Sequence, residues 1–221
     1  MKSLTLITAI SLFSPMSFAT TIESIDSAAN QMDVPALEQL SQQASGYTKA
    51  YADYRLAISA NLKADSDKAN AALEQAVDIL KPAEDAESKA LLAAVYGMQI
   101  GMNPLKGMTL GPKAGSTLDD AADIEPGNPR VLLVRAISAY NTPAIFGGGP
   151  GNAIEFSNQA IASYQQPCTD ICWGHAEAYT WRGLAKQQLG DQQGALDDWQ
   201  QALETNPDYG WAKFLLTQAA R

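Results

Sequence analysis

The last third of the chain carries the pattern that most restricts the fold. From Ala176 to Asp208 the sequence reads AEAYTWRGLAKQQLGDQQGALDDWQQALETNPD. Gly183 is small enough for two helices to approach each other there, Gly190 interrupts the helical pattern, and Pro207 ends it. Between those two breaks, small and large apolar residues recur at the spacing of one helix face: Ala195, Trp199 and Ala202. A helix pair of this kind cannot bury its apolar face alone, so the segment requires a stack of similar units.

This segment resembles the tetratricopeptide repeat almost position for position. The resemblance implies an all-α fold, a right-handed α-solenoid whose extended concave surface binds other molecules. Alignment of the remaining chain to this unit predicts about four helix pairs between an N-terminal helical cap and a C-terminal solvating helix. The expected boundaries are 20–46 for the cap, 47–82, 85–126, 129–167 and 175–207 for the repeats, and 208–221 for the solvating helix.

The second and third repeats depart from the regular period of the family. Roughly eight extra residues separate Ile100 from Ala114, and about five separate Tyr140 from Ala153. The sequence predicts two loops here, 102–113 and 142–151, at equivalent turns of neighbouring repeats, and therefore side by side on one edge. Such insertions are often functional. The alternative is packing of their apolar residues against the edge: Met108, Leu110, Ile145 and Phe146.

The N-terminus has the features of a secretory signal. Lys2 is followed by the apolar run Leu4–Phe13, and Ser17–Ala19 places small residues where a signal peptidase cleaves. We expect cleavage before Thr20 and a periplasmic or secreted protein. The alternative is an uncleaved anchor, but a run of about ten residues is short of the roughly 20 that span a bilayer. No cysteine follows the expected cleavage site, so lipid attachment there is not expected.

The chain is acidic, with a formal net charge of −9, and removal of Lys2 with the signal would leave −10. This charge argues against nucleic acid and against anionic lipid headgroups as partners. It does not discriminate among proteins, peptides and small solutes.

Cys168 and Cys172 are the only cysteines. In an exported protein this close pair predicts a disulfide. The alternative is a metal site with Asp170 and His175, but the spacing matches no common zinc pattern. We therefore expect no metal and no cofactor.

Two glycine-rich segments were considered as phosphate loops. Gly147–Gly151 lacks the Lys and Ser or Thr that follow the glycines of a P-loop, and 111–116 fails the spacing as well. We expect these glycines to serve tight turns, with Asn152 as a helix N-cap. A single histidine and carboxylates that are merely adjacent in sequence, as in Asp119–Asp120, give no catalytic constellation, so we do not expect an enzyme.

In the family, the first helix of each repeat lines the concave groove. The resemblance implies these groove positions: Tyr51, Tyr54, Asn61, Glu87, Met98, Arg130, Tyr140, Asn141, Thr180 and Gln187. Aromatic, thioether and amide side chains suit recognition, although some of them, Tyr54 and Met98 above all, could instead pack between repeats. The expected function is a non-enzymatic scaffold for a protein or peptide segment. The alternative is a small-molecule-binding accessory protein of a solute uptake system, with the two loops bordering its pocket.

Overall fold

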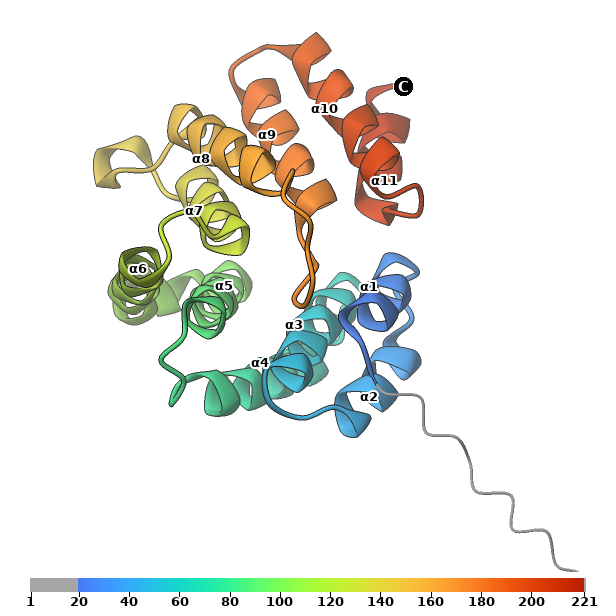
Figure 1. Ribbon diagram of the computed structural model, residues 1–221, viewed down its shortest axis with the longest axis vertical. Helices are drawn as coiled ribbons and strands as arrows, with labels where there is room; N and C mark the ends of the chain where they lie inside the picture. The colour runs from blue at the N-terminus through green and yellow to red at the C-terminus, as the bar shows by residue number, and fades with distance from the viewer. Residues whose placement is uncertain (1–19, 221) are drawn as a thin grey trace, which may run out of the picture.

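The structure is a computed structural model that describes residues 20–220, and all regular structure in that range is helical (Figure 1). The helices are α1 (Ile22–Asn30), α2 (Val34–Gln43), α3 (Gly46–Leu62), α4 (Ser66–Leu80), α5 (Ala86–Met102), α6 (Gly107–Ile124), α7 (Pro129–Asn141), α8 (Pro150–Ser163), α9 (His175–Gln188), α10 (Gln192–Thr205) and α11 (Gly210–Ala219). Two short 3-10 helices, η1 (Pro104–Lys106) and η2 (Ala144–Phe146), lie within turns. The expected signal segment 1–19 is outside the described residues. None of the described helices combines the length and the apolarity needed to cross a bilayer.

Helices that follow one another pack as antiparallel pairs: α3 with α4, α5 with α6, α7 with α8, and α9 with α10. The pairs stack into a curved array in which α5, α7 and α9 face the inside and α6, α8 and α10 the outside (Figure 1). Ala57 and Ala69 are fully buried in the first pair, and these small side chains allow α3 and α4 to approach closely. The predicted all-α solenoid is confirmed.

The last pair shows why its sequence pattern is so specific. Trp199 of α10 is 1% exposed and lies against Gly183 of α9. A Cβ added to Gly183 would lie 2.5 Å from the Trp199 indole nitrogen, so no larger residue fits. Gly190 has a φ of +87°, which favours glycine, and Asp191 caps α10 by accepting a hydrogen bond from the Gly194 N–H at 2.9 Å.

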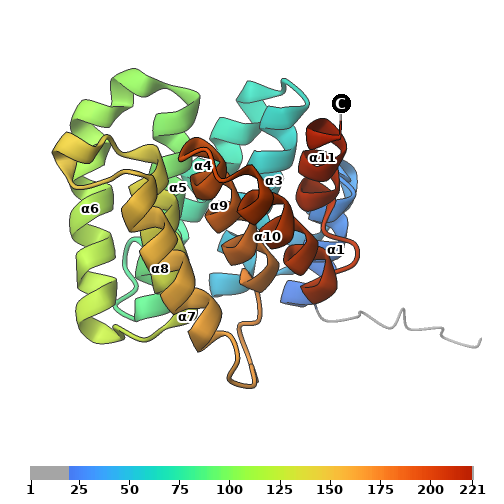
Figure 2. The ribbon, with the colours of Figure 1, turned by 90° about the horizontal axis from the view of Figure 1, so that it is seen from above.

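The chain turns between helices at two opposite edges of the solenoid, and Figure 2 shows these edges as the upper and lower sides. The four turns inside the pairs, from α3–α4 to α9–α10, lie on the upper side of that view, and we call this side the turn end. The loop 164–174 between α8 and α9 lies on the opposite, lower side. The first and last elements also meet, since a Cβ on Gly210 of α11 would lie 2.6 Å from the carbonyl oxygen of Asn30, the last residue of α1.

The predicted loop 102–113 is wrong for most of its length. After α5 ends at Met102 and η1 turns the chain, α6 begins at Gly107, so the extra residues lengthen the second helix of the pair. Pro112 lies inside α6. Its fixed φ is compatible with a helix, and its missing N–H removes one bond near the helix start, which a long helix tolerates.

The segment 142–151 is a tight turn around η2. The N–H of Gly149 donates to the Ala139 carbonyl at 2.7 Å, and the N–H of Gly147 donates to the Ala144 carbonyl at 3.0 Å. Because these amides are already bonded within the turn, they are not aimed at an anion. Asn152 is not the predicted N-cap: Gly149 occupies that position, and the Asn152 amide donates to the Gly147 carbonyl at 3.0 Å.

The packing explanation for the two insertions is wrong for three of their four apolar residues. Met108, Ile145 and Phe146 are 88%, 85% and 75% exposed. Leu110 alone is half-buried against the core. The turn end therefore displays large apolar side chains to solvent.

Candidate functional site

The predicted groove positions divide into two groups. Tyr51, Tyr54 and Thr180 are buried, at 0%, 7% and 0% exposure. The side chains of Glu87 and Arg130 are 14% and 12% exposed and bonded to each other. The other five positions reach solvent, Met98 and Tyr140 in part and three fully: Asn61, Asn141 and Gln187. All five of these lie in the second half of their helices, toward the turn end.

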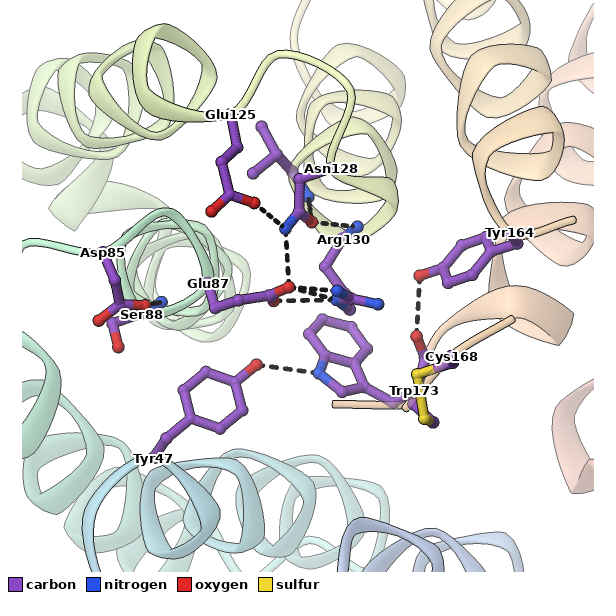
Figure 3. A network of polar contacts seen from close by, with 12 residues as sticks. Tyr47, Asp85, Glu87, Ser88, Glu125, Asn128, Arg130, Tyr164, Cys168 and Trp173 are labelled. Atoms are coloured by element: carbon purple, nitrogen blue, oxygen red, sulfur yellow. Dashed lines mark hydrogen bonds and ion pairs between the residues drawn. A yellow bond between two sulfur atoms is a disulfide. The ribbon is translucent and has the colours of Figure 1, made fainter. Parts of the chain in front are cut away.

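One of the buried positions, Tyr51, is covered by the loop 164–174, which we call the strap. Cys168 and Cys172 are joined by a disulfide within it. Trp173, near the end of the strap, is 3% exposed, and its side chain reaches the first helix pair. Its indole N–H donates to the Tyr47 hydroxyl at 2.9 Å (Figure 3). Its ring also stacks on Tyr51, with centroids 5.1 Å apart.

The strap is anchored at its own base as well. The Tyr164 hydroxyl donates to the Trp173 carbonyl at 2.8 Å. Gly174 follows with a φ of +99°, and a Cβ there would lie 2.3 Å from the Tyr164 hydroxyl. Glycine is therefore required at this position by both its conformation and its contacts. The strap holds Trp173 in one place because each of its ends is fixed.

An ion pair beside Trp173 joins the second and third helix pairs. The Arg130 Nε donates to the two Glu87 carboxylate oxygens at 2.7 and 2.9 Å, and the Asn128 amide donates to the same carboxylate at 2.7 Å (Figure 3). Asn128 also caps α7 by accepting from the Arg130 N–H at 2.9 Å. Burial and the nearby Glu87 carboxylate raise the pKa of Tyr47. All these groups satisfy one another, and Glu87 and Arg130 are bonded inside the fold.

A second ionic cluster joins the first helix pair to the last. Arg55 of α3 lies 3.8 Å from Asp26 of α1 and 3.6 Å from Glu177 of α9. The Tyr51 hydroxyl donates to Asp26 at 2.5 Å. Burial raises the pKa of Asp26 and of Glu177, and the Arg55 charge opposes both shifts. Arg55 thus connects the N-terminal helix α1 with α9 of the last helix pair, across the inner face.

His175 is half-buried in an aromatic stack. Its ring is stacked between Tyr164 and Tyr179, at centroid distances of 5.0 and 5.5 Å, and burial lowers its pKa. Over residues 20–220, no cluster of three or more His, Cys, Asp or Glu side chains is arranged to hold a metal.

One of the solvent-accessible positions, Tyr140, belongs to a chain of three aromatic residues, which we call the aromatic trio. Tyr140 of α7 contacts Trp181 of α9 edge to face, with centroids 5.2 Å apart, and Trp181 contacts Trp211 of α11 in the same way at 5.0 Å. All three are half-buried. The trio joins the third pair, the fourth pair and the terminal helix into one surface, which we call the open half of the inner face.

Sequence reasoning missed Trp173, Trp181, Arg55 and their partners. Trp173 belongs to a loop, and the repeat pattern makes no prediction for loop residues. The one sequence signal for Trp173 was its position directly after Cys172. Trp181 and Arg55 each follow a predicted groove or packing position by one residue. They could have been found by extending the inner face of each helix by one residue.

Two pockets lie elsewhere among the described residues. The larger has a volume of 340 Å³ and lies between α4, α5 and α6, where Glu74, Asp78, Lys81 and Lys113 place both charge signs on its wall. The smaller, of 230 Å³, lies between α2, α3 and α4. Neither pocket includes a predicted groove residue.

No protein-family model matches the chain, and no curated protein matches it significantly. Solved structures are similar in fold. The HusA haemophore from Porphyromonas gingivalis superposes with a TM-score of 0.54 and 22% identity, over 78% of this chain and 96% of that one. A tetratricopeptide repeat protein of Thermus thermophilus, TTC0263, superposes with a TM-score of 0.54 and 18% identity, over 87% and 92%. The chain therefore has the fold of tetratricopeptide repeat proteins, as its last repeat predicted.

Proposed function

We propose that this protein is a non-enzymatic, exported scaffold that holds a segment of a protein or peptide partner against the open half of its inner face. One observation carries the proposal. The predicted groove positions that remain accessible all lie in the second half of the inner helices, and one of them, Tyr140, belongs to the half-buried aromatic trio. These family positions are thus still accessible, whereas the part of the inner face under the strap, which we call the strap half, is filled.

The chemistry of the open half suits a peptide. Half-buried Tyr and Trp rings offer rigid apolar area at a low cost in conformational entropy, because they have few rotatable bonds. Toward the same end of the inner helices, exposed amide side chains can bond the backbone N–H and C=O groups of an extended segment: Asn61, Asn141 and Gln187. The open half provides no concentrated charge, so we expect an uncharged or mixed segment.

The test is affinity capture from periplasmic extract with residues 20–221 as bait, followed by identification of the bound proteins. A bait carrying Asn61→Ala, Asn141→Ala and Gln187→Ala should lose the captured partner. The matched control bait carries Gln193→Ala and Gln201→Ala, which change exposed amides on α10. Equal capture by the two variant baits would place the binding site outside the open half.

A flat apolar small molecule is a second candidate, favoured by the fold similarity to a haemophore and by the aromatic trio. Haemin is the appropriate probe, followed by its visible absorption during titration. Saturable binding that Trp211→Ala weakens would support this candidate over a peptide. A titration that never saturates, together with partner capture as above, would support the peptide.

Export is proposed from the N-terminal sequence alone. Intact-mass measurement of periplasmic material should give a chain that begins at or near Thr20. A species that retains Met1–Ala19 would contradict the secretory interpretation.

A further inference from the structure

The turn end contains two long stretches without an acidic residue. Residues 91–118 and 136–154 contain no Asp or Glu, although 24 of the 221 residues are acidic. At that frequency the two stretches would hold about five acidic residues. They include the turns between α5 and α6 and between α7 and α8. These two turns therefore carry no negative charge of their own.

The same turns display large apolar side chains in fixed positions. Leu105 is 83% exposed at the apex of η1, where the Asn103 side chain accepts from its N–H at 3.2 Å. Ile145 and Phe146 project from η2, whose turn is closed by the Phe146 N–H bond to the Pro143 carbonyl at 2.9 Å. A Cβ on Gly148 would lie 2.0 Å from the Thr142 carbonyl oxygen, so this turn is too tight to fold its apolar residues inward. The exposure is a property of the turn geometry.

Lysines accompany these apolar residues. Lys106 lies between Leu105 and Met108 in sequence, and Lys113 lies further along α6. Across the described part of the chain, neither lysine forms an ion pair with a carboxylate. We call this surface the apolar edge: Leu105, Lys106, Met108, Lys113, Ile145 and Phe146.

We infer that the apolar edge docks on the surface of an anionic lipid bilayer. Apolar side chains on separate, protruding turns do not form a shape that fits one protein pocket, whereas a bilayer interface accepts them without shape complementarity. Unpaired lysines beside such side chains are attracted to anionic headgroups. Glu74 and Asp78 line the same pocket as Lys113. Acidic residues more than about 8 Å from the edge weaken the attraction little, because charges at that distance are largely screened at physiological ionic strength. The expectation from net charge alone, which excluded anionic lipid, is reversed by where the charges lie.

The test is flotation of residues 20–221 with vesicles of phosphatidylglycerol and phosphatidylethanolamine, and with vesicles of phosphatidylcholine. This range contains every described helix and leaves out the apolar run Leu4–Phe13, which could itself enter lipid. The protein should float with the anionic vesicles, and high salt should reduce binding. Ile145→Ser with Phe146→Ser should lower the bound fraction on the order of tenfold. Lys106→Glu and Lys113→Glu should each lower it about fivefold or more.

Matched controls lie away from the apolar edge. Ile124→Ser changes an exposed apolar residue at the far end of α6, and Lys213→Glu changes an exposed lysine on α11. Neither should alter flotation, and urea unfolding should show that every variant folds. Absence of binding to anionic vesicles, or equal loss in the control variants, would overturn the inference. Capture of one defined protein through Ile145 and Phe146 without vesicle binding would overturn it in favour of a protein partner.

Discussion

The strap half and the open half of the inner face are built from the same family positions but differ in their exposure to solvent. In the strap half, Trp173 covers Tyr51, and ionic groups bond one another beneath it. In the open half, the aromatic trio and its amide neighbours remain in contact with solvent. The position of a residue in the repeat therefore predicts which side of the helix it occupies. Whether that side is buried or exposed depends on a segment outside the repeats, here the strap.

The comparison also explains how a curved array of only four pairs is held together. A solenoid normally gains stability only from neighbouring units. Here Trp173 and Arg55 join the C-terminal half to the first pair, over 126 residues in the case of the Trp173–Tyr47 bond. We expect unfolding to be more cooperative than in an open repeat array. Variants in the two halves should therefore differ in how much they lower the free energy of unfolding.

The largest effect is expected from Trp173→Ala. Truncation of a buried aromatic residue costs about 3–5 kcal/mol, and this one also leaves the Tyr47 hydroxyl without its donor. The free energy of unfolding, from urea denaturation followed by circular dichroism, should fall by that amount. Trp211→Ala is the control in the open half and should cost much less. Equal losses in the two variants would mean that the two halves do not differ in their contribution to the core.

Arg55→Met should have the next largest effect. It removes the cation and leaves the Asp26 and Glu177 carboxylates close together and poorly hydrated, which costs about 3 kcal/mol. Because neutralising a carboxylate removes that repulsion, the loss should be smaller at pH 5 than at pH 7. An equal loss at both pH values would show that the carboxylates stay hydrated and that Arg55 acts only through packing.

Opening the strap disulfide should cost less. Cys168→Ser with Cys172→Ser removes a constraint on a very short loop, which the chain-entropy model values at about 2 kcal/mol. The parent protein should show no free thiol in labelling without reductant. If two thiols react in fresh protein, the strap is held by Trp173 and Tyr164 alone.

The fold was predictable because Gly183, Trp199 and Pro207 mark one repeat so specifically that the others could be aligned to it. The helical extension through Pro112 was not predictable, since Gly and Pro in sequence indicate a break and only the tertiary packing of α6 overrides it. For the site, the predicted groove positions lie on the first helices of the pairs, but a single sequence does not say that a loop covers Tyr51. The contacts of Trp173 depend on the curvature of the whole array, which local pattern does not encode.

The pH response of the strap half should depend on His175. Because burial lowers its pKa, the unfolded chain binds a proton at a higher pH than the folded chain. Stability should therefore fall as the pH drops below about 6.5, the usual pKa of histidine. Asp26 and Glu177, whose pKa values are raised, act in the opposite direction at lower pH. The difference between the parent and His175→Gln isolates the histidine: the parent should lose more stability between pH 7.5 and 5.5. Identical losses would mean that the ring takes up its proton at the same pH in the folded and the unfolded chain.

The smallest effect on stability is expected in the open half. Asn61→Ala, Asn141→Ala and Gln187→Ala change exposed amides, and the one hydrogen bond among them, from Asn141 to the Ile137 carbonyl, is local to α7. Each should change the free energy of unfolding by no more than about 0.5 kcal/mol, the range of surface substitutions. Tyr51→Phe is the matched change in the strap half, and it should cost about 1.5–3 kcal/mol because its hydroxyl bonds the charged Asp26. If the amide variants cost as much as Tyr51→Phe, the open half is part of the core and the proposed binding surface is lost. If they cost little and partner capture falls, the two halves differ as the structure indicates: one is built for stability and the other is left available for binding.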